Sequence, residues 1–106
     1  MIKTASEFLA LSALKRSKVK VRGQEIHFRE LSVAERGAML KIAQDTPAEA
    51  PAWLVATCVT TPDGSQMFDV GQASEIAKTA PEVVDAVASA ILNLSGMKGE
   101  DEPKNV

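Results

Sequence analysis

The stretch FRELSVAERGAML, residues 28 to 40, joins two kinds of secondary structure and so decides the fold. Before it, apolar and polar residues alternate as in a half-buried strand, and after Leu31 the pattern becomes helical. Ser32 and Glu35 have the spacing of a capping box, in which each side chain hydrogen-bonds the other residue's backbone N–H. The stretch therefore predicts a strand, a corner and a helix that reaches about Gln44. The expected buried residues of this helix are Val33, Met39, Leu40 and Ala43.

A two-stranded hairpin is predicted upstream of this corner, because valines, Ile26 and Phe28 alternate with charged residues. The pivot is Gly23-Gln24, where a glycine at the first central position suits a type II′ turn. A lone hairpin is marginal in water, so its apolar face must lie on helices. Its other face is mostly basic and is predicted to contact a partner. The basic residues are Lys18, Lys20, Arg22 and Arg29.

Further capping boxes and apolar patterns predict several short helices. The boxes are Thr4–Glu7, Thr46–Glu49, Thr79–Glu82 and the looser Asp69–Gln72. The expected helices, besides the one after Ser32, cover about 5–14, 52–60, 70–78 and 81–94. The fold class is therefore α+β, mainly α: one domain over 1–97, with four to five short helices packed on a two-stranded hairpin. The acidic segment 98–106 is expected to be disordered.

The last predicted helix has a wide apolar surface and a narrow polar stripe of Asp85, Ser89 and Asn93. Such a helix needs more than one neighbour to cover it, and a second subunit could supply part of that cover. Val84, Val87 and Ile91 are accordingly predicted as contact residues.

No residue pattern points to catalysis, a metal or a cofactor. His27 is the only histidine, without further ligands nearby, and is expected at the surface or facing a partner. Cys58 lies in the most apolar helix and is expected to be buried packing. Trp53 suits either the core or the anchor of an interface. The carboxylates form no convincing pair and no glycine-rich phosphate loop is present, so an enzyme is not expected.

The charges are divided unevenly along the chain. Residues 1–41 carry nine Lys/Arg and four Asp/Glu, a net charge of +5, whereas residues 42–106 carry three and ten, a net charge of −7. This asymmetry suits a charged partner or a second copy of the chain, and equally two solvated faces. A single cysteine favours a reducing cytoplasm, and neither a signal peptide nor a membrane span is predicted.

The order of these elements resembles that of a known family. The run LALSALKRSKV leads into the charged hairpin, HFRELSVAERGAML follows, WLVATCVTTPDGSQMF ends in a turn, and LNLSGM closes the last helix. Over residues 2 to 97 the chain is similar to the tail assembly chaperones of long-tailed bacteriophages. Many of these chaperones are made in a short and a longer form, and the chain resembles the short form. Its motifs are helix caps and turns rather than a catalytic signature.

This resemblance implies a non-enzymatic protein in the cytoplasm of the host bacterium that is absent from the mature virion. Members of the family hold the helical tape measure protein while tail tube subunits polymerise around it, and they recruit those subunits. The implied partners are the tape measure protein, the tail tube protein, further copies of the chain and a longer form made by ribosomal frameshifting.

Two other functions stay open at this point. A small DNA-binding regulator of a phage or mobile element would use the basic hairpin, although the hairpin lacks the interleaved aromatic residues typical of single-strand binders. A permanent tail or neck component would instead be found in finished particles.

The basic hairpin face gives a first prediction. Reversing Lys20 and Arg22 to Glu should weaken partner binding without unfolding the domain, because both residues are expected to face solvent. Binding in a pull-down and a thermal unfolding curve of the same variant measure the two effects. Loss of folding would show that these charges hold the domain together.

Overall fold

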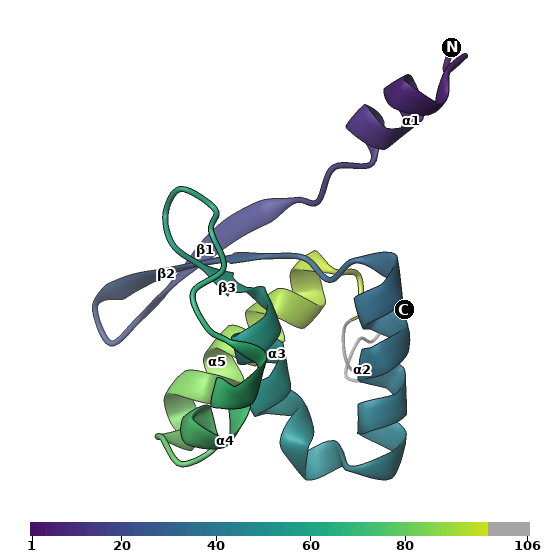
Figure 1. Ribbon diagram of the computed structural model, residues 1–106. Coiled ribbons are helices and arrows are strands. Elements are labelled where there is room, and N and C mark those ends of the chain that lie inside the picture. The colour runs from purple at the N-terminus through teal and green to yellow at the C-terminus, as the bar shows by residue number, and fades with distance from the viewer. Residues whose placement is uncertain (98–106) are drawn as a thin grey trace, which may run out of the picture.

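The structure is a computed structural model, and it describes residues 1–97. The hairpin and the helices follow one another in the predicted order (Figure 1). The α-helices are α1 (Ala5–Leu11), α2 (Val33–Asp45), α3 (Ala50–Cys58), α4 (Ala73–Ile76) and α5 (Pro81–Leu94). The strands are β1 (Arg16–Val21), β2 (Gln24–Arg29) and β3 (Val59–Thr60), and two 3₁₀ turns cover Pro47–Glu49 and Val70–Gln72. The predicted disordered segment 98–106 lies outside the described residues.

The predicted hairpin is confirmed, but its turn is of another type. Val21 pairs with Gln24, so Arg22 and Gly23 are the two central residues. Their φ angles are 52° and 80°. Positive φ at both positions is characteristic of a type I′ turn, which matches the right-handed twist of the strands. The predicted type II′ turn centred on Gly23-Gln24 is therefore wrong by one residue.

A third strand enlarges the sheet, and the order is β1-β2-β3 with both pairs antiparallel. The predicted helix 52–60 ends at Cys58, because Val59 adopts an extended conformation. Val59 and Thr60 then pair with Phe28 and His27, which satisfies backbone groups on the free edge of β2. The predicted α+β class is confirmed, with five helices and a three-stranded rather than a two-stranded sheet.

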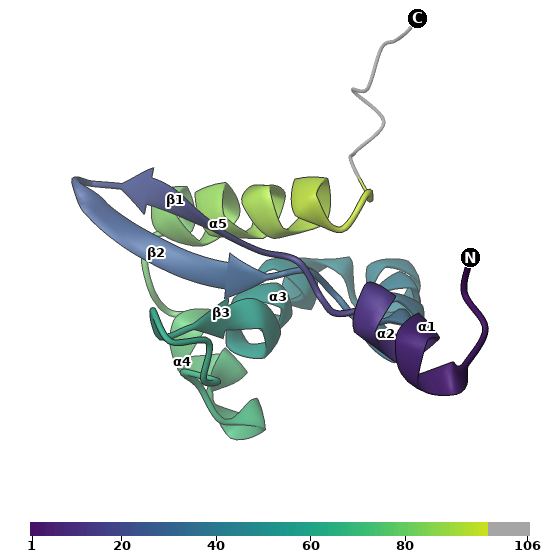
Figure 2. The same ribbon diagram turned by 90° about the horizontal axis from the view of Figure 1, so that it is seen from above.

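The core lies where α3 and α5 pack together beneath the sheet (Figure 2). Six of the nine residues of α3 are buried, and the predicted burial of Cys58 in this most apolar helix is confirmed. Leu54, Cys58 and Ile91 are the most deeply buried side chains, and Phe28 joins them from β2. Trp53 is partly buried against this core. The apolar face of the hairpin also packs here through Val19, Val21 and Ile26.

The corner predicted from residues 28–40 is held by a forked ion pair. Arg29 Nη1 and Nη2 donate to Glu35 Oε1 and Oε2 at 2.7 and 2.9 Å, and Nη2 also donates to the carbonyl of Thr57 at 3.0 Å. The Ser32–Glu35 capping box forms as predicted. One guanidinium thus ties β2, the first turn of α2 and the end of α3 together.

Helix α2 has its inward face at a different phase from the predicted one. Glu35 faces the corner, so residues four and seven positions later, Met39 and Ile42, also turn inward. The predicted buried residues Val33, Leu40 and Ala43 are exposed instead, Leu40 with 60% of its surface. The ion pair, rather than the largest apolar side chains, sets the rotation of this helix.

The remaining capping boxes divide into two groups. Thr4–Glu7 and Asp69–Gln72 form as predicted. Thr46 instead ends α2 without a side-chain cap, and Thr79 Oγ1 donates backwards to the carbonyl of Ile76, leaving Ala80 as the N-cap of α5. The predicted helix 70–78 is accordingly a short 3₁₀ turn followed by α4.

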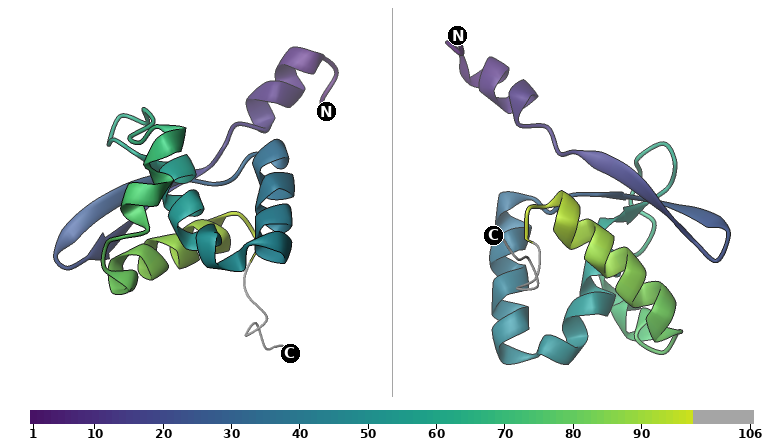
Figure 3. Two further views of the ribbon diagram at one scale, coloured as in Figure 1. Left: turned by 60° about the horizontal axis from the view of Figure 1, so that its bottom comes forward. Right: turned by 180° about the vertical axis from the view of Figure 1, so that it is seen from behind.

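Helix α1 projects away from the body of the domain in Figures 1 and 3. It ends at Leu11 rather than at the predicted residue 14. Every residue from Met1 to Lys18 is exposed, including the apolar residues Phe8, Leu9, Leu11 and Leu14. Within residues 1–97, no helix is both long enough and apolar enough to cross a membrane.

The core arrangement predicts a large difference between two aliphatic substitutions. Ile91→Ala should lower the free energy of unfolding by about 2–5 kcal/mol, because a fully buried side chain leaves a cavity. Leu40→Ala should change it by less than about 0.5 kcal/mol, since Leu40 lies on the exposed face of α2. Urea unfolding followed by circular dichroism measures both. Equal effects would contradict this packing.

Candidate functional site

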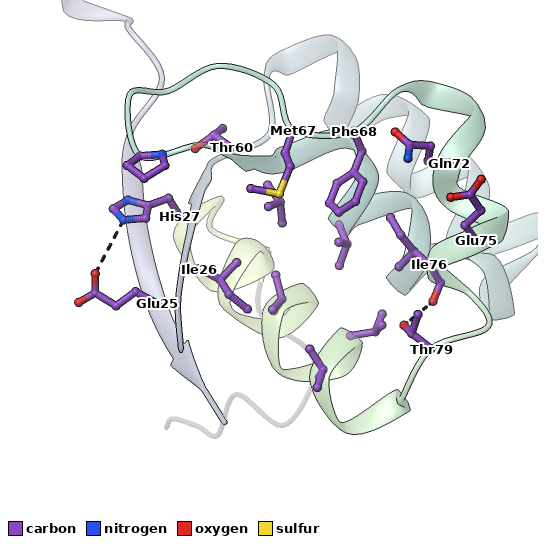
Figure 4. A pocket seen from close by; sticks show the side chains of 16 residues that line it. Glu25, Ile26, His27, Thr60, Met67, Phe68, Gln72, Glu75, Ile76 and Thr79 are labelled. Carbon is purple, nitrogen blue, oxygen red and sulfur yellow. Dashed lines mark hydrogen bonds and ion pairs between the residues drawn. The ribbon is translucent and has the colours of Figure 1, made fainter. Parts of the chain in front are cut away.

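A deep apolar pocket of about 420 Å³ lies among the described residues. It lies between β2, β3 with the loop that follows it, α4 and α5. Figure 4 shows side chains from these separate elements surrounding one common space. The aliphatic, aromatic and thioether side chains on its wall include Ile26, Val59, Met67, Phe68, Ile76 and Val84.

The loop after β3 supplies one wall of this apolar pocket and is held by its own polar groups. Thr61 and Gly64 close the turn through a 2.9 Å backbone hydrogen bond, with Gly64 at a φ of 96°. The carboxylate of Asp63 accepts from the Thr61 hydroxyl and from the backbone of Ser65, and these bonds lower its pKa. The turn therefore directs the chain back toward the body of the domain.

The amide of Gln66 then fixes the residues that cover the pocket. Its Nε2 donates to the carbonyl of Phe68 at 3.1 Å and to that of Ala56, on α3, at 3.4 Å. Phe68 packs against the core, whereas Met67 keeps 47% of its surface exposed at the pocket mouth. Phe68 is therefore part of the packed body, and Met67 remains accessible to a ligand.

The rim of the apolar pocket is acidic. Glu25 and Glu75 are its charged residues, and no lysine or arginine lines it. Glu25 lies 3.3 Å from Lys18 Nζ and 3.8 Å from His27 Nε2, and Glu75, on α4, forms no ion pair within residues 1–97. The predicted surface position of His27 corresponds to this half-buried rim. The site is suited to apolar side chains flanked by positive charge.

The structure separates the four basic residues that were predicted to form one contact face. Lys18 pairs with Glu25, and Arg22 pairs with Glu82 of α5 at 3.1 Å. Arg29 has 18% of its side chain exposed and holds the corner, so its role is structural rather than partner-facing. Lys20 is exposed and makes no ion pair within the described chain. The hairpin's positive charge is therefore largely balanced inside the domain.

The three predicted contact residues of the last helix also have different positions. Val84 and Val87 line the apolar pocket, though both are mostly covered. Ile91 is 0% exposed and belongs to the core of this chain, so it is not part of the candidate site.

Sequence reasoning missed most of the pocket, because its wall residues come from elements far apart in the chain. Ile26, Met67, Phe68 and Ile76 have no common spacing or motif. The excess of apolar surface on the last helix was the one signal that pointed to it.

The thiol of Cys58 is buried in the core and does not line this pocket. Burial raises the pKa of the Cys58 thiol to about 12, so the thiol stays protonated at neutral pH. Within residues 1–97, no three His, Cys, Asp or Glu side chains are grouped so that they could hold a metal ion.

Comparisons with known proteins add no relative to these observations. No protein-family model, no curated protein and no solved structure matches the chain at a significant level.

The corner ion pair predicts a pH dependence of stability. The hydrogen bonds from Arg29 lower the pKa of Glu35 below its ordinary value of 4.5. Glu35 therefore stabilises the fold fully above its unfolded-state pKa, and that contribution is lost as the pH falls through the folded-state pKa. Glu35→Gln should cost about 1–3 kcal/mol at neutral pH and flatten the loss of stability below about pH 4.5.

Glu25→Gln is the matched control, because Glu25 is half exposed and its ion pair should contribute less than about 1 kcal/mol. Urea unfolding at several pH values between neutral and acidic measures both variants. If both variants lose the same free energy of unfolding at each pH, the corner ion pair stabilises the fold no more than the exposed pair does.

Proposed function

We propose that this chain is a non-enzymatic tail assembly chaperone of a long-tailed bacteriophage, which holds the tape measure protein and helps to recruit tail tube subunits. The observation that carries the proposal is the apolar pocket between β2, the loop after β3, α4 and α5. A recess of about 420 Å³ with aliphatic walls is suited to side chains on one face of an amphipathic helix. A helical tape measure protein offers such side chains before its tube encloses it.

The charge at the pocket supports a protein partner over a nucleic acid. Phosphate binding needs uncompensated lysine and arginine, whereas the rim carries Glu25 and Glu75. Three of the four basic residues of the predicted contact face are paired with carboxylates of the same chain. A DNA-binding regulator is therefore the less well supported alternative.

Recruitment of tail tube subunits would use a different surface from the pocket. Lys20 on β1 and the apolar residues on the outer face of α2, Val33 and Leu40, are exposed and lie outside the pocket wall. Two separate surfaces would let the chain hold one partner while it meets another.

The pocket predicts the effect of a single charge on the binding of the tape measure protein. Met67→Asp should reduce its recovery by roughly tenfold or more, because binding would bury an unpaired carboxylate at the mouth. Leu40→Asp is the matched control, since it places the same charge on an exposed apolar residue away from the pocket. The measurement is a pull-down of tagged chain from cells that produce the phage, with recovered proteins quantified by mass spectrometry.

Other outcomes of this experiment would indicate a different binding surface or a different function. Unchanged recovery with Met67→Asp and loss with Leu40→Asp would move the binding surface to α2. A bait present in purified mature particles would indicate a permanent tail component. Salt-sensitive retention on DNA, with no tail protein recovered, would favour the regulator.

A further inference from the structure

We propose that helix α1 of one copy of the chain binds in the apolar pocket of a second copy. The inference rests on the proposed function only in treating this pocket as a site for a protein helix. It assigns that site a second occupant, which is a segment of the chain itself. Two apolar surfaces without a partner, one convex and one concave, are the observations from which it begins.

The convex surface is α1, which is amphipathic and makes no packed contact with the body. Phe8, Leu9 and Leu11 lie within about half of the helix circumference, and Ala10 lies on the opposite side. All of them are exposed, Leu9 with 68% of its surface. A short helix that shows this much apolar surface is suited to a groove in a partner.

Charge complementarity favours the pocket as that groove. Residues 1–17 carry Lys3, Lys15 and Arg16 against a single acidic residue, Glu7. Glu7 is engaged in the capping box at the N-terminus of α1, where its Oε1 accepts from the backbone N–H groups of Lys3 and Thr4. The pocket has acidic residues on its rim and no basic ones. Opposite charges therefore flank the two apolar surfaces.

The tether of α1 directs it to a second copy rather than to its own pocket. Lys15 is fixed to Glu30 by two hydrogen bonds, from its N–H to Glu30 Oε2 at 2.7 Å and from the Glu30 N–H to its carbonyl at 2.9 Å. Only residues 12–14 remain between this anchor and α1, a span of about 10 Å when extended. Figures 1 and 3 show α1 beyond the Arg16 end of β1, with α4 on the far side of the body.

This arrangement gives the pocket a cover that a client can displace. In a self-associated chain, α1 of a neighbour shields the apolar wall from water. A longer apolar helix then competes for the same wall. A chain whose α1 cannot enter the pocket should therefore bind a client helix more tightly.

Cross-linking between two different variants tests the contact directly. Leu9→Cys chains and Met67→Cys chains are purified separately, mixed and treated with a short bis-maleimide. Cys58 can be kept, because its buried thiol stays protonated. A cross-linked dimer that joins position 9 of one variant to position 67 of the other is expected. Ala10→Cys in place of Leu9→Cys is the matched control, because Ala10 is exposed on the opposite side of α1, and a several-fold lower yield is expected from it.

Two results of the cross-linking would overturn the proposal. Equal yields from Ala10→Cys and Leu9→Cys would show random collision rather than a docked face. A chain that carries both Leu9→Cys and Met67→Cys and is linked within itself, as a monomer, would show that α1 reaches its own pocket.

Sedimentation equilibrium of the full chain separates this proposal from the proposed function. Leu9→Asp and Met67→Asp should each weaken self-association by roughly tenfold or more, because each buries a charge in the contact, whereas Ala10→Asp should not. A wild-type chain that stays monomeric at its highest soluble concentration would sink the inference. Self-association that depends on Leu9 without recovery of a tape measure protein would leave it standing and remove only the proposed function.

Discussion

The rest of the structure depends on the forked ion pair between Arg29 and Glu35. Arg29 ends β2 and Glu35 sits in the first turn of α2, so the pair fixes the angle at which the chain leaves the sheet. The same guanidinium reaches the carbonyl of Thr57, which anchors the end of α3 where β3 begins. Because the pair is mostly shielded from water, the attraction between its two charges is stronger than it would be at the surface. Loss of either one would leave the other charge poorly solvated.

A second polar contact closes the corner from the opposite direction. The backbone N–H of Leu31 donates to Ser95 Oγ at 2.9 Å, and both residues are buried. This bond places the C-terminal end of α5 beside the corner, so that α5 runs from there along the sheet. The other end of α5 is left beside α4, and the apolar pocket opens between them. The pocket therefore depends both on the orientation that the corner gives to α5 and on the side chains that line it.

The local patterns of the sequence predicted most helices and strands well, but they predicted less well how these elements pack and pair. The hairpin, the Ser32 cap, the central helix and the burial of Cys58 follow from alternation, spacing and apolar content within a few residues. The rotation of α2 could not be predicted this way, because Leu40 is more apolar than its neighbours and is nevertheless exposed. Strand β3 was missed for a related reason. Val59 and Thr60 continue an apolar run that suits a helix, until the free edge of β2 offers them hydrogen bonds.

The sequence by itself determined the order of the elements, the class of the fold and the division of charge, since each depends on neighbours along the chain. Only the tertiary structure decided which charges are enclosed and which are exposed, and which apolar residues line one pocket. Arg29 and Lys20 belong to the same hairpin, yet one is enclosed by Glu35 and Thr57 and the other is exposed. Likewise, Ile26, Met67 and Ile76 form one wall although 50 positions separate the first from the last. Burial and shared surfaces depend on contacts between distant segments, and no local pattern encodes those contacts.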